Sequence, residues 1–286
     1  MKLKLKLSRN ADSFINYLQN FSKIQPSLLL EIDINNEMFV AKCLSESRAS
    51  VRYSTIDFKS CNIGVVVPNE KANSRINLGI LNQLPKFIRV IERFNEDLDS
   101  TESTSFDIDL EFTSIKNKDN MDMLACTVVE FISPTLSMKF DGFMLAEFKY
   151  MTDEQFFSNI FNVGNPIEFN MSSDIIDNTI KTSEIAKNNS TDNSIIFMSK
   201  GKDIYVTDSK NEHKSNYCFK ITTMGTECSP FSVALNRDIF MKMFNKSKED
   251  YSIIIGLSPL NNNIIDRVLF NSLNTNTKMV ISCLSE

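Results

Sequence analysis

A two-residue alternation of polar and apolar side chains recurs along this chain, and it constrains the fold more than any other feature. That period places successive side chains on opposite faces of a half-buried β-strand. The alternating segments are residues 28–34, 38–42, 50–58, 106–112, 124–131 and 136–148. We therefore expect a chain dominated by β-strands.

Four other segments show helical spacing, with apolar residues three or four positions apart: 11–23, 78–94, 174–187 and 236–246. Two of these predicted helices fall in each half, and the second half repeats the order of the first. Residues 36–40 match 202–206 in pattern, at the same offset at which 50–53 match 216–219. An internal duplication is the interpretation that we favour.

A chain of 286 residues has room for two hydrophobic cores. We predict an α+β protein with two pseudo-repeated domains, residues 1–149 and 167–286, joined by a connector at 150–166. The connector contains Phe156, Phe157, Ile160 and Phe161, and strand alternation resumes at Ile167. Ordinary core packing or a short helix is an equally good reading of those phenylalanines.

The composition excludes several classes of protein. With 42% hydrophobic and 23% charged residues, and no apolar run near the roughly 20 residues of a spanning helix, no membrane protein is expected. The opening Met-Lys-Leu-Lys-Leu-Lys-Leu predicts a strand rather than a secretory signal. Six cysteines without a Cys-x-x-Cys pair argue against disulfides or zinc and fit a reducing cytoplasm.

Catalytic chemistry has little support in the sequence. The single histidine, His213, lies in a polar turn, and seven glycines form neither a dinucleotide fingerprint nor a phosphate-binding loop. Asp107, Asp109 and Glu111 share one face of a strand and could hold a hard cation, although a solvated strand face is the simpler reading. No nucleophile elbow is recognisable. We expect no enzyme, no metal site and no cofactor.

The net charge of -5 opposes nucleic-acid binding, but the distribution of charge does not. At about 100° per residue, Lys86, Arg89 and Arg93 lie within roughly 60° of one another, opposite an apolar face. The predicted helices together carry Lys23, Lys86, Arg89, Arg93, Lys181, Lys187, Arg237, Lys242 and Lys246. A solvated face explains any one helix, whereas agreement among the four favours a common cationic surface.

The order of elements and several local runs resemble the DNA sliding clamps, the family of proliferating cell nuclear antigen and of phage and viral clamps. The runs are 37–54, 76–78, 231–235 and 278–284. The resemblance implies two domains, each with two helices packed on antiparallel sheets, that close as a trimer into a ring around duplex DNA. It implies that the cations above face the DNA and contact phosphates without reading sequence.

The resemblance also implies partners: a DNA polymerase, a clamp-loader ATPase, and peptides that insert apolar anchors into a pocket under the connector. Mapped onto this chain, that pocket comprises Leu44, Arg48, Ala49, Val280, Ile281 and Ser282, with Phe156 and Phe157 as a cover. The family's proline in the last strand is Cys283 here, and its acidic tail is reduced to Glu286. Subunits of the family join by pairing edge strands of unlike domains.

The expected function is therefore a processivity factor in DNA replication, in the host cytoplasm for a phage or at the site of replication otherwise. One alternative keeps the fold but tethers an RNA polymerase during late viral transcription. A β-rich virion structural protein and a single-strand binder are alternatives of other classes. The latter would interleave aromatic residues with cations on its strands.

Overall fold

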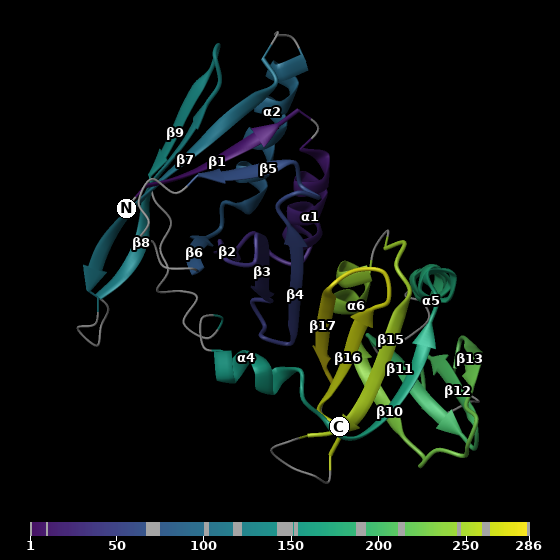
Figure 1. The fold of residues 1–286 in the computed structure, drawn as a ribbon. Helices are drawn as coiled ribbons and strands as arrows, with labels where there is room; N and C mark the ends of the chain where they lie inside the picture. The colour runs from purple at the N-terminus through teal and green to yellow at the C-terminus, as the bar shows by residue number, and fades with distance from the viewer. Residues whose placement is uncertain are drawn as a thin grey trace. The chain divides into compact units, whose positions relative to one another are not determined.

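A computed structural model of the chain describes residues 2–9, 11–66, 75–99, 103–116, 122–141, 151, 154–186, 193–210, 215–244, 247–258 and 264–284. The chain divides into two compact units (Figure 1). The first comprises Met1–Cys43 and Tyr53–Glu154, and the second comprises Leu44–Arg52 and Gln155–Glu286.

The first unit contains two sets of antiparallel strands. One sheet has the order β5-β1-β7-β8-β9, formed by β1 (Lys2–Ser8), β5 (Ile63–Val66), β7 (Ser105–Lys116), β8 (Asp122–Ile132) and β9 (Ser137–Asp141). The other set has the order β6-β2-β3-β4, formed by β2 (Leu28–Asp33), β3 (Met38–Leu44), β4 (Ser50–Asp57) and β6 (Arg75–Ile80). The end of β3 at Leu44 and the start of β4 at Ser50–Arg52 belong to the second unit. Alternating residues such as Leu28, Leu30 and Ile32 point into the core, as the two-residue period predicts.

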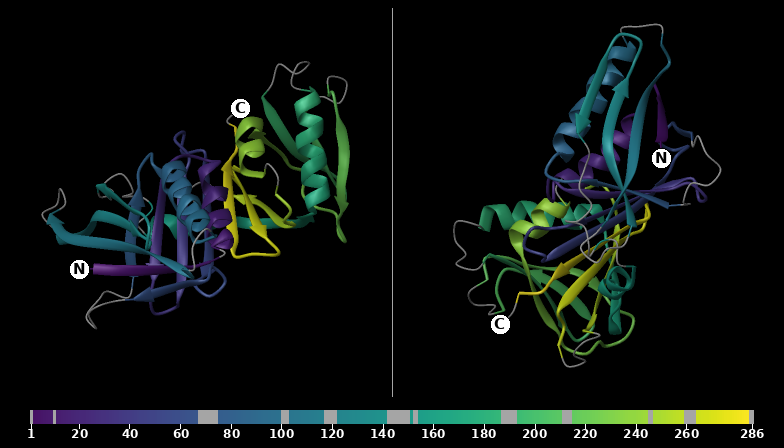
Figure 2. Two further views of the ribbon diagram at one scale, coloured as in Figure 1. Left: turned by 90° about the horizontal axis from the view of Figure 1, so that it is seen from above. Right: turned by 90° about the vertical axis from the view of Figure 1, so that its left-hand side faces the viewer.

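Two helices, α1 (Asp12–Ser22) and α2 (Leu84–Asp99), lie side by side in this unit (Figure 2). Gln19 of α1 donates a hydrogen bond of 2.9 Å to Glu92 of α2. The apolar face of α2 is buried, and Phe94 packs on Phe106 with 5.5 Å between ring centroids. The opposite face is left to charged side chains, which is the arrangement expected of an amphipathic helix.

The second unit repeats this construction. Its sheets have the orders β10-β15-β16-β17 and β14-β11-β12-β13. The strands are β10 (Gly164–Met171), β11 (Ser194–Lys200), β12 (Asp203–Thr207), β13 (Cys218–Thr223), β14 (Ser232–Asn236), β15 (Tyr251–Leu257), β16 (Arg267–Ser272) and β17 (Thr277–Ser282). The helices are α4 (Glu154–Ile160), α5 (Ser173–Ala186) and α6 (Arg237–Phe244). Phe197, Phe240, Phe244 and Phe270 form an aromatic core.

The strand orders make the internal duplication visible. Strands β1-β7-β8-β9 correspond to β10-β15-β16-β17, and β6-β2-β3-β4 correspond to β14-β11-β12-β13. Helices α1 and α2 take the same places in the chain order as α5 and α6. The predicted α+β class, with two pseudo-repeated domains of helices and antiparallel sheets, is therefore confirmed.

The helix predicted at residues 78–94 is shifted in the structure. Residues Arg75–Ile80 form β6, which pairs with β2, and α2 begins only at Leu84. Pro85 occupies the first turn, where a missing N–H group costs nothing. The helix continues to Asp99, five residues beyond the predicted end at residue 94. The strand predicted at 136–148 is described only as far as Asp141.

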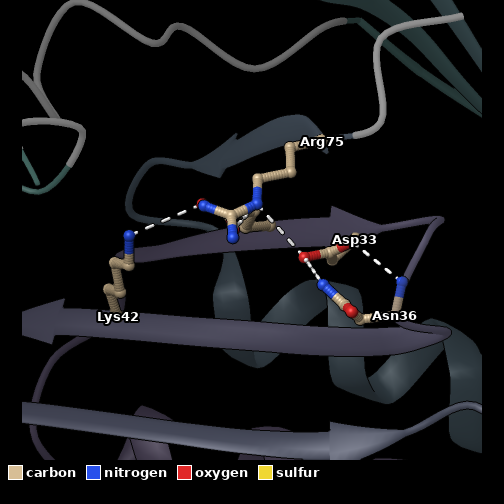
Figure 3. Close-up of polar contacts among 5 residues, drawn as sticks. Asp33, Asn36, Lys42 and Arg75 are labelled. Carbon is tan, nitrogen blue, oxygen red and sulfur yellow. Dashed lines mark hydrogen bonds and ion pairs between the residues drawn. The ribbon is translucent and has the colours of Figure 1, made fainter.

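A buried ion network links three strands of the first unit (Figure 3). Lys42 Nζ of β3 lies 3.5 Å from Glu31 Oε2 of β2, and both residues are less than a tenth exposed. Arg75 Nε of β6 lies 3.1 Å from Asp33 and 3.8 Å from Glu31. Asp33 also accepts hydrogen bonds from the backbone and side chain of Asn36. Each buried carboxylate therefore has a cationic neighbour.

Candidate DNA-binding and partner-binding surfaces

The cationic face predicted on α2 is present. Lys86, Arg89 and Arg93 are exposed, while Phe87, Ile88 and Ile91 between them are buried. Arg93 Nη1 lies 3.5 Å from Glu96 Oε2 on the same helix. Arg89 makes no hydrogen bond or ion pair with the residues that the structure describes. Arg89 is thus the cation of this face most available to an anionic ligand.

Lys86 is placed differently from the two arginines. Its ammonium nitrogen lies 4.7 Å from the centroid of the Phe140 ring on β9. A cation over an aromatic ring at this distance is attracted by the negative ring face. The charge of Lys86 is therefore directed toward the neighbouring strand.

Two further helices each present one exposed cation. Lys23 follows α1 and donates a hydrogen bond of 3.4 Å to Asn20, and Lys242 lies on the exposed side of α6. Lys187 and Lys246 lie outside the described residues.

Arg237 does not point outward, and the expectation that it adds to an exposed cationic face is wrong. Only 4% of its surface is exposed. Its Nε donates a hydrogen bond of 2.9 Å to Asn193 Oδ1, and its backbone N–H donates to Asn193 O. It opens α6 directly after β14, which pairs with β11, and so its side chain folds back onto the start of β11.

Helix α5 carries more carboxylates than cations. Lys181 is exposed, but its Nζ lies 2.5 Å from Asp177 Oδ2, and that hydrogen bond raises the pKa of Lys181. Asp174 and Glu184 are exposed on the same helix. Three carboxylates against one ammonium make α5 net acidic, in contrast to α2.

The loop predicted to line a partner pocket is a tight turn in the second unit. Two hydrogen bonds close the turn. The backbone N–H of Ser45 donates to Ser50 O, and the backbone N–H of Ser50 donates to Ser45 Oγ. Arg48 is exposed at the tip with a φ of 57°, the left-handed region. Leu44 and Ala49 are partly exposed, and Ala49 O accepts a hydrogen bond of 2.8 Å from Ser282 N. The structure therefore brings this loop and the final strand together.

Not every predicted pocket residue reaches the surface. Val280 and Ile281 are 4% and 0% exposed, so the expectation that their side chains line a surface pocket is wrong. Phe157 is 8% exposed and packs on Phe161 at 5.3 Å. The side chain of Phe156 lies outside what the structure describes. Leu284, which we did not predict as a pocket residue, is 41% exposed two residues after the end of β17.

Arg267 ties α4 to the sheet of the second unit. Its guanidinium pairs with both carboxylate oxygens of Asp266 at 2.8 Å and donates to the carbonyls of Asn159 and Ile160. Asp266 also accepts from Ser258, and these contacts, Arg267 first, hold its pKa below the usual range. Cys283 N donates to Asp266 O. The sequence did not predict this contact between Arg267 and α4, because an Asp-Arg pair at the start of a strand is not a specific pattern.

The candidate carboxylates on β7 face the lysines of β1. Lys4 lies opposite Asp109 in the strand register, and its Nζ is 2.8 Å from Asp107 and 3.6 Å from Asp109. Among the described residues, no group of three or more histidine, cysteine or acidic side chains is arranged to hold a metal ion. His213 lies outside the described residues. Nor does the described part of the chain contain a helix long and apolar enough to cross a membrane.

Several solved structures of beta clamps and of PCNA match this chain over 99–100% of its length, and the fold is therefore that of a DNA sliding clamp. The chain aligns over 100% of its length with the DNA polymerase III beta chain of Streptococcus pneumoniae, at 13% identity and a TM-score of 0.60. It spans 66% of that longer chain.

Two further matches carry bound peptides. The PCNA of A. fulgidus, in a structure with the C-terminal region of FEN-1, is covered over 99% of both chains, at 10% identity and a TM-score of 0.59. The Helicobacter pylori beta clamp bound to a DNA ligase peptide has 7% identity and a TM-score of 0.61, with 99% of this chain and 66% of that one covered. No family model matches the chain, and no curated protein matches its sequence. The resemblance to sliding clamps is thus confirmed at the level of fold.

Proposed function

We propose that this protein is a DNA sliding clamp, a ring that encircles duplex DNA and tethers a DNA polymerase to it. The observation that carries the proposal is the sliding-clamp fold over the whole chain, together with an exposed cationic face on α2. A ring holds DNA by topology, so weak phosphate contacts suffice and sequence is not read. No catalytic group is required for this role.

The DNA contact is uneven around the proposed ring. Arg89 and Arg93 of α2 supply exposed positive charge, whereas α5 presents three carboxylates and one paired lysine. Lys23 and Lys242 add one exposed cation each. We therefore assign the main phosphate contact to α2, with Arg89 at its centre. A net charge of -5 is compatible with this, because the field at a surface depends on local charge.

The internal duplication suggests how the ring closes. Within the second unit, the end of β17 is hydrogen-bonded to the residue that precedes β4, through Ser282 N and Ala49 O. Strand β9 is the counterpart of β17, and β13 is the counterpart of β4; each lies at the edge of its sheet in the described residues. We assign the joint between copies to β9 of one chain and β13 of the next.

The side chains of the two edges suit such a joint. Met138 of β9 is 37% exposed and Phe140 beside it is partly exposed, while Phe219 of β13 is partly exposed and Ile221 is buried. A head-to-tail pairing of unlike edges closes into a ring when the rotation between copies is correct. Three copies of a two-domain chain then give six domains.

The partner site that we propose lies on the second unit, around the turn at 45–49 and the end of β17. Leu44, Ala49 and Leu284 supply apolar surface, and Arg48 supplies a positive charge at the tip. The neighbours with FEN-1 and DNA ligase peptides show that proteins of this fold bind such segments. A short peptide with apolar anchors and an acidic residue fits this surface.

Light scattering over a range of protein concentrations tests the proposal. Three copies of the 32.6 kDa chain give a mass of about 98 kDa. A mass that never exceeds that of the single chain would contradict the ring. Isolation of the protein with an RNA polymerase rather than a DNA polymerase would favour the late-transcription role instead.

A further inference from the structure

Strand β9, to which we assign one side of the subunit joint, is held from the same helix that carries the proposed DNA contact. We propose that α2 braces β9 at both ends, through Lys86 at one end and Asp97 at the other, and thereby sets the geometry of the joint. This inference rests on the proposed ring closure at β9. It makes Lys86 a positioning residue for the joint.

The first brace is at the start of α2. Lys86 Nζ lies 4.7 Å from the Phe140 ring centroid, and Gln83 and Phe87 line the same small hollow. Phe140 meets Phe131 of β8 edge to face at 5.8 Å, and Phe131 meets Phe87 at 5.5 Å. The far end of β9 is thus connected to α2 both through aromatic packing and through a cation over the ring face.

The second brace is at the end of α2. Asp97 Oδ2 accepts hydrogen bonds from Ser133 Oγ, at 2.8 Å, and from Thr135 Oγ1, in the turn between β8 and β9. The turn closes on itself through Ser133 N donating to Leu136 O at 2.8 Å. The bonds from Thr135 and Ser133 lower the pKa of Asp97, so the charged form that accepts them is favoured. A hydrogen bond to a charged group is stronger than a neutral one.

These contacts matter because β9 lies at the edge of its sheet. In the described residues β9 pairs with β8, and the paired positions run from Asp141 opposite Val128 to Ser137 opposite Ile132. A five-residue edge strand with one ladder frays easily, and a frayed edge is a poor template for a second chain. Because α2 holds β9 in place before a second chain binds, less conformational entropy is lost when the subunits associate.

Two substitutions remove the braces one at a time. Asp97→Ala deletes the acceptor for the turn, and Lys86→Met keeps the aliphatic stem but removes the ammonium group. Glu96→Ala is the matched control, because Glu96 is an exposed carboxylate of α2 that pairs with Arg93 on the same helix. The readouts are hydrogen exchange of the β9 amides and the association constant from sedimentation equilibrium, both without DNA.

We expect Asp97→Ala to speed exchange at residues 137–141 by about tenfold and to weaken each joint by about tenfold. Lys86→Met should give a smaller change of the same sign, which a Phe140→Leu background abolishes. Glu96→Ala should change neither readout.

Two results would overturn the inference, and they differ. Unchanged exchange and association in Asp97→Ala and Lys86→Met, in a protein that forms trimers, would show that α2 does not brace the edge. A wild-type chain that stays monomeric would instead contradict the proposed ring itself, and with it any role at the joint.

Discussion

Replacing Lys42 by methionine tests whether the buried ion network of the first unit stabilises the fold. Lys42 and Glu31 are 7% and 8% exposed, and 3.5 Å separates Lys42 Nζ from Glu31 Oε2. Removing one partner of a buried pair typically costs about 3–5 kcal/mol, because the remaining charge is left without compensation. Here Glu31 keeps Arg75 Nε at 3.8 Å, and methionine preserves the packing of the lysine stem. We therefore expect a decrease in stability of about 2–3 kcal/mol, below the usual range.

Urea unfolding at pH 7, followed by circular dichroism, measures this change as a shift in midpoint at constant slope. The double variant with Lys42→Met and Glu31→Leu is the control, because it removes both charges. It should recover stability to within about 1 kcal/mol of the wild type. A Lys42→Met protein within about 0.5 kcal/mol of the wild type would refute the reasoning. So would a double variant less stable than Lys42→Met alone.

Four further outcomes follow from particular features of the structure. Burial raises the pKa of Asp33, but hydrogen bonds from Asn36 and the charge of Arg75 outweigh it, so the pKa lies below its ordinary value. Its contribution to stability is present above the ordinary carboxyl pKa and is lost as pH falls through the lowered one, and Asp33→Asn should flatten that acid limb in pH-dependent unfolding. A Cβ atom at Gly256 would lie 2.6 Å from Gly164 O and 2.9 Å from Val163 Cγ2, so Gly256→Ala should cost about 1–3 kcal/mol in thermal unfolding. Arg267→Met should release α4, seen as faster hydrogen exchange at residues 154–160 with little change in the core strands. Arg89→Ala should reduce the slope of log affinity for duplex DNA against log salt concentration, by about 0.9 for each phosphate that the protein no longer neutralises. Lys181→Ala should reduce that slope less, because Lys181 is already paired with Asp177.

Local pattern was sufficient for most of the elements of this fold. The two-residue alternation placed β2, β3, β4, β7 and β8. It misplaced the start of α2, because residues 78–80 fit helical spacing and yet pair with β2. What decides between the two is a tertiary contact with a strand about 50 residues earlier, and no local period contains it.

The candidate surfaces were predicted less completely, for the same reason. Arg89 and Arg93 follow from the helical wheel alone. Arg237, by contrast, lies on the face of its wheel that carries Phe240 and Phe244, so the wheel already places it with the buried residues. The acceptor for its guanidinium, Asn193, lies 44 residues earlier and is not part of the local pattern. Val280 and Ile281 are both buried although they are neighbours, so β17 is covered on both faces and shows no alternation to read. The contact of Asp97 with Ser133 is likewise invisible in either local sequence.

Encirclement of DNA is the central claim, and a linear duplex with removable end blocks tests it without a loader. The protein is allowed to thread onto a duplex tethered at one end, the free end is then blocked, and the sample is washed in high salt, which screens phosphate contacts. A ring should stay bound until a nuclease cuts the duplex, and should then be released at once. Loss of the protein in the wash at the same rate with blocked and open ends would contradict the account.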